Sequence, residues 1–125
     1  MIKFVVHGTP IPKQSYRAVK GGGYLYPRVV EWEQLVSTYA RQAMAGRPPL
    51  IGNLVMTILF VLPDHRKRDL DNLIKGVSDS LNGIVFEDDS QVVDLHVTKQ
   101  VVKQTPGVFV TVDNAPDTKL VDLPY

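Results

Sequence analysis

The feature that most constrains this fold is the stretch of residues 64–94, where a helical hydrophobic pattern lies between two groups of charged residues. Apolar residues recur there at helical spacing and stop at Asn82-Gly83, which predicts a helix with one buried face. Asp69 and Asp71 flank Leu70, the first residue of this stripe. Because residues two apart point in different directions on a helix, we expect Asp69 at or before the N-cap, in extended geometry. The stripe itself consists of Leu70, Leu73, Ile74, Val77 and Leu81.

The remaining hydrophobic pattern predicts an α/β (α+β) fold, a mixed sheet of about four to six strands with two main helices. We expect one compact domain over residues 1–125, with a loosely held tail from about residue 114. An uncharged apolar run predicts a central strand covered on both faces, and a turn at residues 104–107 predicts a terminal hairpin. The expected elements are a strand at Ile2–His7, a helix from Arg28 to Ala45, the central strand from Ile51 to Leu62, a strand from Gln91, and a return strand from Val108 to Val112.

Charge is segregated along the chain although its net value is only +1. Residues 1–50 carry seven Lys/Arg and two Glu, a balance of +5, whereas residues 64–94 carry four Lys/Arg and eight of the thirteen acids, a balance of −4. Such a chain can attract phosphates with one region and gather cations with another. The absence of cysteine excludes disulfides and thiolate zinc sites, and the N-terminal segment resembles neither a secretory signal nor a membrane span. We therefore expect a cytoplasmic protein without a membrane partner.

Four aspartates within the acidic stretch are candidate metal ligands: Asp69, Asp71, Asp88 and Asp89. Two carboxylates about 4 Å apart repel by roughly 4 kcal/mol at a protein surface, and a divalent cation relieves this repulsion. Oxygen ligands without Cys or paired His favour Mg²⁺ or Mn²⁺. Lys75, one helical turn after Asp71, could stabilise a phosphoryl transition state. The alternative is structural, because acids favour helix N-termini and Asp-Asp turns are common at solvated surfaces.

Basic residues near the N-terminus form a second candidate site. Lys13, Arg17 and Lys20 precede the glycine run 21–23, and Tyr24 follows it, which predicts a hairpin or loop that grips a nucleic-acid backbone. An ordinary solvated turn is the alternative interpretation. The three histidines are weaker candidates: we expect His65 and His96 to be surface or hydrogen-bonded residues, and His7 to be structural.

Two motifs together resemble the RusA family of Holliday-junction resolvases, small endonucleases that are often prophage-borne. The first is Arg68-Asp69-Leu70-Asp71-Asn72-Leu73 followed by Lys75, and the second is Asp88-Asp89-Ser90-Gln91-Val92-Val93-Asp94. The resemblance covers residues 55–103 well and the N-terminal part more weakly. A two-part motif with both halves at the right separation is far more specific than a single Asp-x-Asp.

The resemblance implies a homodimer that binds four-way DNA junctions and makes paired nicks with Mg²⁺ or Mn²⁺. It implies that Asp69, Asp71 and Asp89 are the essential metal-binding acids, with Asp88 as their neighbour and Lys75 as the catalytic lysine. The basic run Arg66, Lys67 and Arg68 matches a stretch that contacts phosphates. The Gly21–Gly23 run and the extended tail depart from the family pattern.

The function expected from the sequence is a metal-dependent endodeoxyribonuclease that resolves Holliday junctions in DNA recombination and repair. One alternative is a branched-DNA-binding module whose acids are structural. A second is a metal-dependent enzyme that acts on nucleotides or other nucleic acids. Salt-sensitive binding of branched DNA without nicking would identify the first alternative. An assay in which junction, duplex and mononucleotide substrates compete would identify the second.

Overall fold

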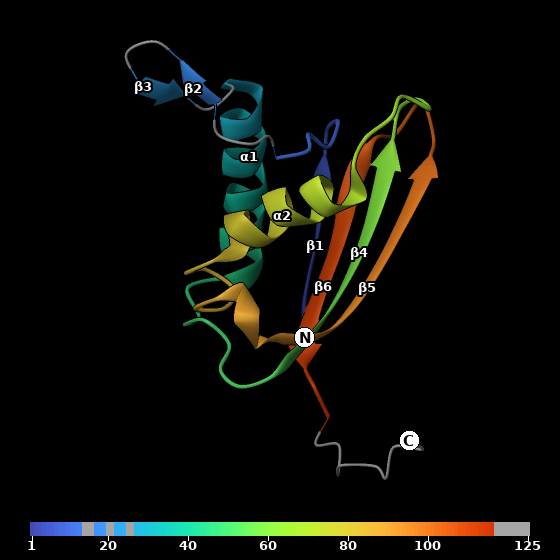
Figure 1. Cartoon of the computed structure of the whole chain (residues 1–125). Coiled ribbons are helices and arrows are strands. Elements are labelled where there is room, and N and C mark those ends of the chain that lie inside the picture. The colour runs from blue at the N-terminus through green and yellow to red at the C-terminus, as the bar shows by residue number, and fades with distance from the viewer. Residues whose placement is uncertain (14–16, 20–21, 25–26, 117–125) are drawn as a thin grey trace, which may run out of the picture.

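A four-stranded sheet with both long helices on one face makes up most of the structure, a computed structural model (Figure 1). It describes residues 1–13, 17–19, 22–24 and 27–116. Among the residues described, no helix is both long and apolar enough to cross a membrane. The elements are β1 (Ile2–His7), β2 (Arg17–Val19), β3 (Gly22–Tyr24), α1 (Pro27–Met44), β4 (Leu54–Leu62), α2 (Leu70–Leu81), the short 3₁₀ helix η1 (Asp89–Gln91), β5 (Val92–Val101) and β6 (Gly107–Asn114).

The main sheet has the strand order β1-β6-β4-β5 and is mixed. Strands β4 and β5 are parallel, with α2 and η1 in the crossover between them, whereas β6 runs antiparallel to both β4 and β1. Parallel strands need such a long crossover because the chain must return to the starting end of the sheet. This architecture confirms the expected α+β fold with a mixed sheet and two main helices.

The expected hairpin between β5 and β6 is wrong. Strand β6 leaves β5 after the turn and inserts between β4 and β1. Burial explains the choice: Val108, Val110 and Val112 are at most 1% exposed, so β6 belongs in the middle of the sheet. Strand β5 is mostly exposed, which suits an edge.

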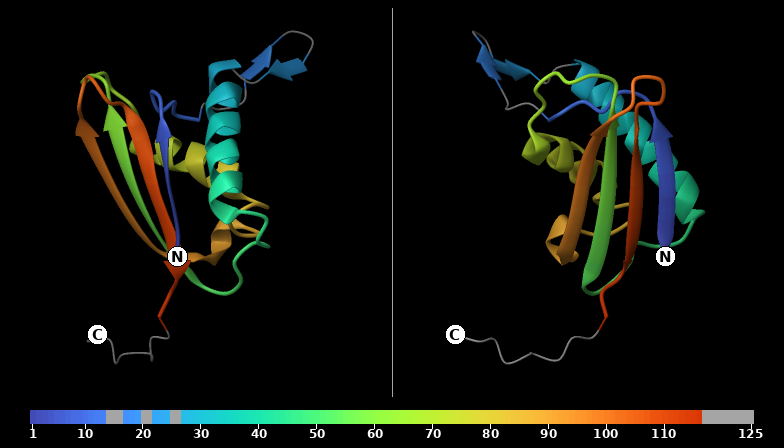
Figure 2. Two further views of the ribbon diagram at one scale, coloured as in Figure 1. Left: turned by 180° about the vertical axis from the view of Figure 1, so that it is seen from behind. Right: turned by 90° about the vertical axis from the view of Figure 1, so that its right-hand side faces the viewer.

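Helical cover reaches only one face of the sheet, so the expectation that β4 is buried on both faces is also wrong (Figure 2). Along β4 burial alternates: Met56 and Ile58 face the helices and are at most 1% exposed, whereas Thr57 on the opposite face is exposed. Trp32, Val36 and other residues of α1 pack against this inner face together with α2. The uncharged run of β4 therefore reflects its central position, not two covered faces.

Helix α2 forms as its sequence pattern predicts. Leu73, Val77 and Leu81 are fully buried in the core, and the helix ends before Gly83, whose φ of 77° is a conformation that favours glycine. The helix begins after Asp69, which occupies the N-cap with φ −68° and ψ 119°. The predicted extended geometry of Asp69 is thus confirmed.

The glycine-containing segment before α1 forms a short antiparallel pair, β2 and β3, with Arg17 opposite Tyr24. This agrees with the expected hairpin. Lys20 lies outside the described residues, as does most of the expected C-terminal tail, residues 117–125. Directly after β6, the amide of Ala115 donates to the carbonyl of Asn53.

Gly107 gives a test of the close packing between β6 and β1. A Cβ atom added at this residue would lie 2.5 Å from the carbonyl oxygen of Val6, a backbone atom that cannot move freely. We expect Gly107→Ala to lower the free energy of unfolding by about 1–3 kcal/mol, measured by urea denaturation. The control Thr111→Val, on the open face of the same strand, should change it by less than about 0.5 kcal/mol. Equal effects of the two variants would contradict this account.

Candidate functional site

Two aspartates, Asp69 and Asp71, lie at the start of α2. The amide of Asp71 donates to Oδ1 of Asp69 over 3.0 Å, and Nδ2 of Asn72 lies 3.4 Å from Oδ2 of Asp69. Both aspartates are exposed, and both lie at the N-terminal end of the helix. The fold therefore holds Asp69 by its cap hydrogen bonds and leaves Asp71 in the first turn beside it.

A second pair of carboxylates, Asp88 and Asp89, lies in the turn that opens η1. Asp88 is the N-cap, and its Oδ2 accepts from the amide of Ser90 over 3.1 Å. Hydrogen bonds from the Ser90 side chain and amide hold the pKa of Asp88 below its usual range. Asp89 is exposed in the first position of η1. These bonds fix the turn and keep Asp88 ionised at neutral pH.

Gln91 anchors this turn to the rest of the molecule. Its Oε1 accepts from the amides of Glu87 and Asp88, and its Nε2 donates to the carbonyls of Leu50 and Gly52, both over 3.0 Å. Gln91 was not among the candidates from the sequence. The signal was present, because an Asp followed three residues later by Gln is a capping-box pattern.

The two pairs of carboxylates lie at opposite ends of the sheet. Asp69 follows the end of β4, and the carbonyl of the preceding Arg68 accepts from Lys99 Nζ over 3.3 Å. Lys99 is opposite Phe60, whereas Val92, directly after η1, is opposite Leu54. Six residues of strand separate these levels, about 20 Å, and the 12-residue helix α2 spans about 18 Å.

The expected convergence of four aspartates is therefore not present within one chain. In the part of the chain that the structure describes, no three His, Cys, Asp or Glu side chains form a group that could hold a metal ion. Asp69 and Asp71 lie together at the start of α2, and Asp88 and Asp89 lie together at the start of η1, but the fold separates the two pairs. The assignment of these residues as metal ligands remains a prediction.

Lys75 points away from the core on the same side of α2 as Asp71, with 61% of its side chain exposed. Its nearest carboxylate partner is Asp79, with Lys75 Nζ 3.9 Å from Oδ2, one turn further along the helix. The sequence contained this signal, since residues four apart are neighbours on a helix surface. The ion pair that the structure shows for Lys75 is therefore with Asp79.

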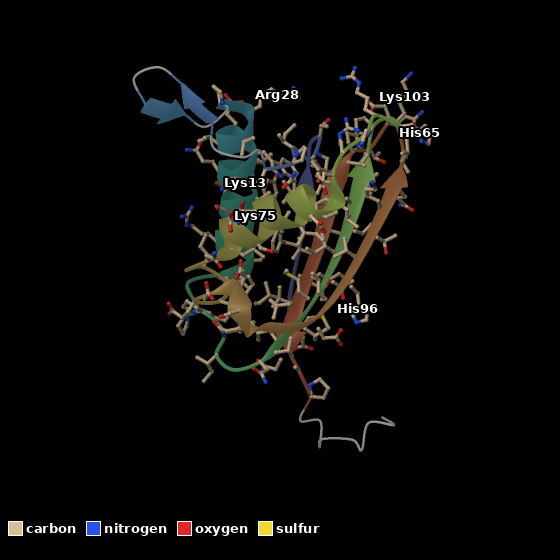
Figure 3. The ribbon with its side chains drawn as sticks, in the orientation of Figure 1. Lys13, Arg28, His65, Lys75, His96 and Lys103 are labelled. Atoms are coloured by element: carbon tan, nitrogen blue, oxygen red, sulfur yellow. The ribbon has the colours of Figure 1, made fainter. Side chains whose placement is uncertain are left out.

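Lys13 is a member of the same network of charges, and it lies close to Lys75 in Figure 3. Its Nζ is 2.9 Å from Oε1 of Glu33 and 3.1 Å from Oδ2 of Asp79. Burial lowers the pKa of Lys13, but the hydrogen bonds with Glu33 and Asp79 outweigh this effect and raise it overall. Two carboxylates neutralise its charge, so Lys13 has a structural role between α1 and α2, and its predicted contact with DNA stays a prediction.

The basic run after β4 has two kinds of residue. Arg68 is only 11% exposed and is held by Asp64, with Arg68 Nη1 2.8 Å from Asp64 Oδ1. This hydrogen bond holds the pKa of Asp64 below its usual range. Arg66 and Lys67 are exposed, and Arg66 lines a cavity of about 150 Å³ together with Lys99 and other residues. This end of the sheet therefore presents cations close to Asp69.

The remaining candidates are less informative. His96 is exposed, and its Nε2 lies 3.0 Å from Oδ1 of Asp94. This agrees with the expected hydrogen-bonded surface histidine. The side chain of Arg17 and the whole of Lys20 lie outside what the structure describes, so their predicted contact with DNA is unchanged.

Comparisons with known sequences agree with the motif. The sequence model of the family described as "Endodeoxyribonuclease RusA" matches residues 7–113, a range that includes both pairs of aspartates. A crossover junction endodeoxyribonuclease RusA of Aquifex aeolicus (strain VF5) is 27% identical over 89% of this chain and 90% of the relative. YqaN of Bacillus subtilis (strain 168) is 61% identical over 78% of this chain and 86% of the relative. A crossover junction endodeoxyribonuclease rusA of Enterobacteria phage HK97 is 44% identical over 43% of this chain and 44% of the relative.

The cap formed by Asp88 predicts a dependence of stability on pH. Because folding lowers the pKa of Asp88, its stabilising contribution is complete above the unfolded value of about 3.9 and is lost as the pH falls through the folded value. We expect the wild type to lose more free energy of unfolding between neutral and acidic pH than Asp88→Asn, which keeps a cap acceptor but cannot titrate. Urea denaturation at a series of pH values, in a chelator, measures this.

Glu87→Gln is the matched control, since it removes a carboxylate from the same turn that does not cap η1. Its pH profile should follow that of the wild type. If Asp88→Asn followed the wild type as well, the cap would contribute nothing to acid sensitivity.

Proposed function

The chain belongs to the RusA family of endodeoxyribonucleases, and on this premise we propose that it cleaves four-way DNA junctions by paired, metal-dependent nicks. The observation that carries the proposal is the start of α2, where the carboxylate of Asp69 caps the helix and the exposed Asp71 follows in its first turn. A helix needs only one N-cap, and Asp69 supplies it. The exposed Asp71 beside it is therefore available for another role.

The donors at these positions suit Mg²⁺, with Mn²⁺ as a substitute. All candidate ligands are carboxylates, and Mg²⁺ in phosphate chemistry is commonly held by one or two carboxylates together with water and substrate oxygens. We propose Asp69 and Asp71 as the minimal pair of ligands, because Asp88 and Asp89 lie at the other end of the sheet in the same chain. A bound Mg²⁺ would polarise the scissile phosphodiester and lower the pKa of a bound water.

Lys75 is the residue that we propose to stabilise the transition state. Its ammonium group is exposed and lies one helical turn from Asp71, so a phosphate held near Asp71 would be within its range. Asp79 limits the positions of this side chain without burying it. A positive charge aimed at the phosphoryl oxygens stabilises the charge that develops as the bond breaks.

The basic residues are proposed to bind the backbone of branched DNA. Arg66 and Lys67 project from the loop that precedes Asp69, with Arg68 behind them fixed by Asp64. Phosphate contacts carry no sequence information, so selection of a junction would rest on its shape. We also propose DNA contacts for Arg17 and Lys20, on the sequence pattern alone, whereas Lys13 would contribute less because two carboxylates already neutralise it.

A homodimer completes the proposal, because a junction has approximate two-fold symmetry and two nicks need two sites. Resolution of junctions would give the protein a role in DNA recombination and repair in the cytoplasm of a bacterium, and the phage relative is consistent with a prophage origin. The second candidate is a branched-DNA-binding module without catalysis. The separation of the two pairs of aspartates within one chain favours it, since neither pair alone provides the four expected ligands.

Asp71→Asn separates these two functions. We expect the variant to lose nicking of a synthetic four-way junction by more than about 10³-fold, because a carboxylate needed for the ion becomes a neutral amide. Binding of the junction should persist, as measured by gel shift with and without Mg²⁺. Glu31→Gln, an exposed carboxylate on α1, is the control and should nick at the wild-type rate. If the wild type binds the junction but does not nick it at any Mg²⁺ concentration tested, the result would support the second candidate, a DNA-binding module without catalysis.

Lys75→Ala tests the proposed charge stabilisation. We expect its nicking rate at saturating Mg²⁺ and DNA to fall by about 10²–10³-fold, with little change in junction affinity. Single-turnover kinetics measures the rate apart from binding. Lys103→Ala, in the exposed turn before β6, is the control. A fall of less than threefold in Lys75→Ala would reduce Lys75 to an ion-pair partner of Asp79.

A further inference from the structure

We propose that the open face of the sheet binds an unpaired base of DNA, which stacks on Phe109 while the adjoining phosphate lies beside Arg66 at the tip of the sheet. The tip is the end of the sheet at which β4 ends and β6 begins. This inference goes beyond the proposed cleavage, because the contact needs no metal ion and the base lies on the face of the sheet opposite α2. It rests only on membership of a family of endodeoxyribonucleases, which makes DNA the expected ligand.

The face of the sheet opposite the helices is open and partly apolar. In the right panel of Figure 2 the sheet lies in front of both long helices, and no described element covers it. On this face Phe109 of β6 lies between Val5 of β1 and Leu59 of β4, its partners in the strand register. Phe109 is 43% exposed although its strand is central in the sheet. Single exposed apolar side chains are common on protein surfaces, but adjoining ones indicate a contact site.

A hollow adjoins Phe109 on the side of the tip. In the next row across the strands, Gly107 lies between His7 and Val61 and contributes no side chain. The hollow has a volume of about 170 Å³, and Val102 forms a further apolar wall. Pockets that hold a whole small molecule usually measure roughly 300–1,000 Å³. This hollow therefore suits one planar ring of a larger ligand.

A second hollow, of about 150 Å³, lies at the same tip and is cationic. His65, Arg66 and Lys99 line it, and His65 projects from this end of the sheet in Figure 3. Gln100 lines both hollows, so the two adjoin at this residue. The side chain of Arg66 is 84% exposed, and its nearest ion-pair contact is a long one, with Nε 3.7 Å from Oδ2 of Asp64. The guanidinium group of Arg66 is therefore accessible to a phosphate.

The chemistry of the two hollows matches the two halves of a nucleotide. Among the described residues, no carboxylate lines either hollow. An aromatic side chain that stacks on a base, next to cations that contact the backbone, is the usual arrangement in single-strand binders, and several of them use an open sheet. Branched DNA offers bases near its branch point that cost least to unstack. An apolar protein segment would fit the first hollow but would leave the cationic one without a partner.

Phe109→Ala tests the stacking contact. Binding of a fluorescein-labelled oligothymidylate is measured by anisotropy in EDTA, so that cleavage does not contribute. We expect the affinity to fall about 5- to 150-fold, the range for loss of one base stacked on an aromatic side chain. Phe109→Tyr keeps the ring and should bind like the wild type. The matched control is Ile51→Ala, which removes an apolar side chain that is 84% exposed in the chain before β4 and should not change the affinity.

An abasic oligonucleotide of equal length separates the base from the backbone. It carries the same phosphates without rings, so the wild type should bind it as weakly as Phe109→Ala binds the oligothymidylate. Phe109→Ala should not distinguish the two ligands, because ring and base act as a pair. Arg66→Ala should weaken both ligands alike and reduce the slope of log affinity against log salt by about 0.7, the value for one phosphate of a single strand. Phe109→Ala should leave this slope unchanged.

Several outcomes would overturn the inference. Equal affinity of the wild type for the two oligonucleotides, or unchanged affinity in a Phe109→Ala variant that urea denaturation shows to be folded, would leave the face to a protein partner. A lower oligomeric state of Phe109→Ala in sedimentation would show that a second copy covers the face. Tighter binding of an oligouridylate than of the oligothymidylate would overturn the choice of DNA, and an unchanged salt slope in Arg66→Ala would overturn the phosphate contact.

The test is independent of the proposed cleavage. If the wild type binds the oligothymidylate through Phe109 but does not nick a four-way junction, the proposed function fails and this inference stands. If the wild type nicks the junction but binds both oligonucleotides equally, the inference fails and the proposed function stands.

Discussion

Parallel pairing of β4 with β5 is the constraint on which this structure depends. A parallel crossover starts at the carboxyl end of the first strand and must deliver the chain to the amino end of the second. Asp69 lies at the beginning of this crossover and Asp88 at its end, so the sheet separates them by the length of a strand. Among the strands that the structure describes, β5 is the last on its side of the sheet.

Local hydrogen bonds then fix each pair of aspartates without reference to the other. Asp69 caps α2 and Asp88 caps η1, so one member of each pair is held by backbone amides while its neighbour is exposed. In each pair, the capping carboxylate (Asp69 or Asp88) therefore orients the backbone, and the carboxylate of its neighbour (Asp71 or Asp89) is available to a ligand. Gln91 adds the connection to the chain before β4, which makes the second turn part of the rigid fold.

Charge at the opposite end of α2 is organised differently. Asp79 lies between Lys13 and Lys75, and Glu33 shares Lys13, so the ammonium of Lys13 is largely neutralised between the helices. Lys75 has only a distant partner and stays exposed. The two lysines therefore differ in role. Lys13 joins α1 and α2 through its ion pairs, whereas Lys75 remains available to a phosphate.

The sequence by itself determined the local features: the stripe of α2, its end at Gly83, the N-cap at Asp69 and the α+β class. Each of these depends on residues within a few positions of one another, where helical periodicity and capping chemistry act. It could not determine the strand order. The turn between β5 and β6 is compatible with a hairpin of these two strands, and only the burial of β6 shows that it lies between β1 and β4. Only the tertiary structure decided that Asp69 and Asp88 lie at opposite ends of one sheet, since the direction of a crossover strand is set by its partner and not by its own residues.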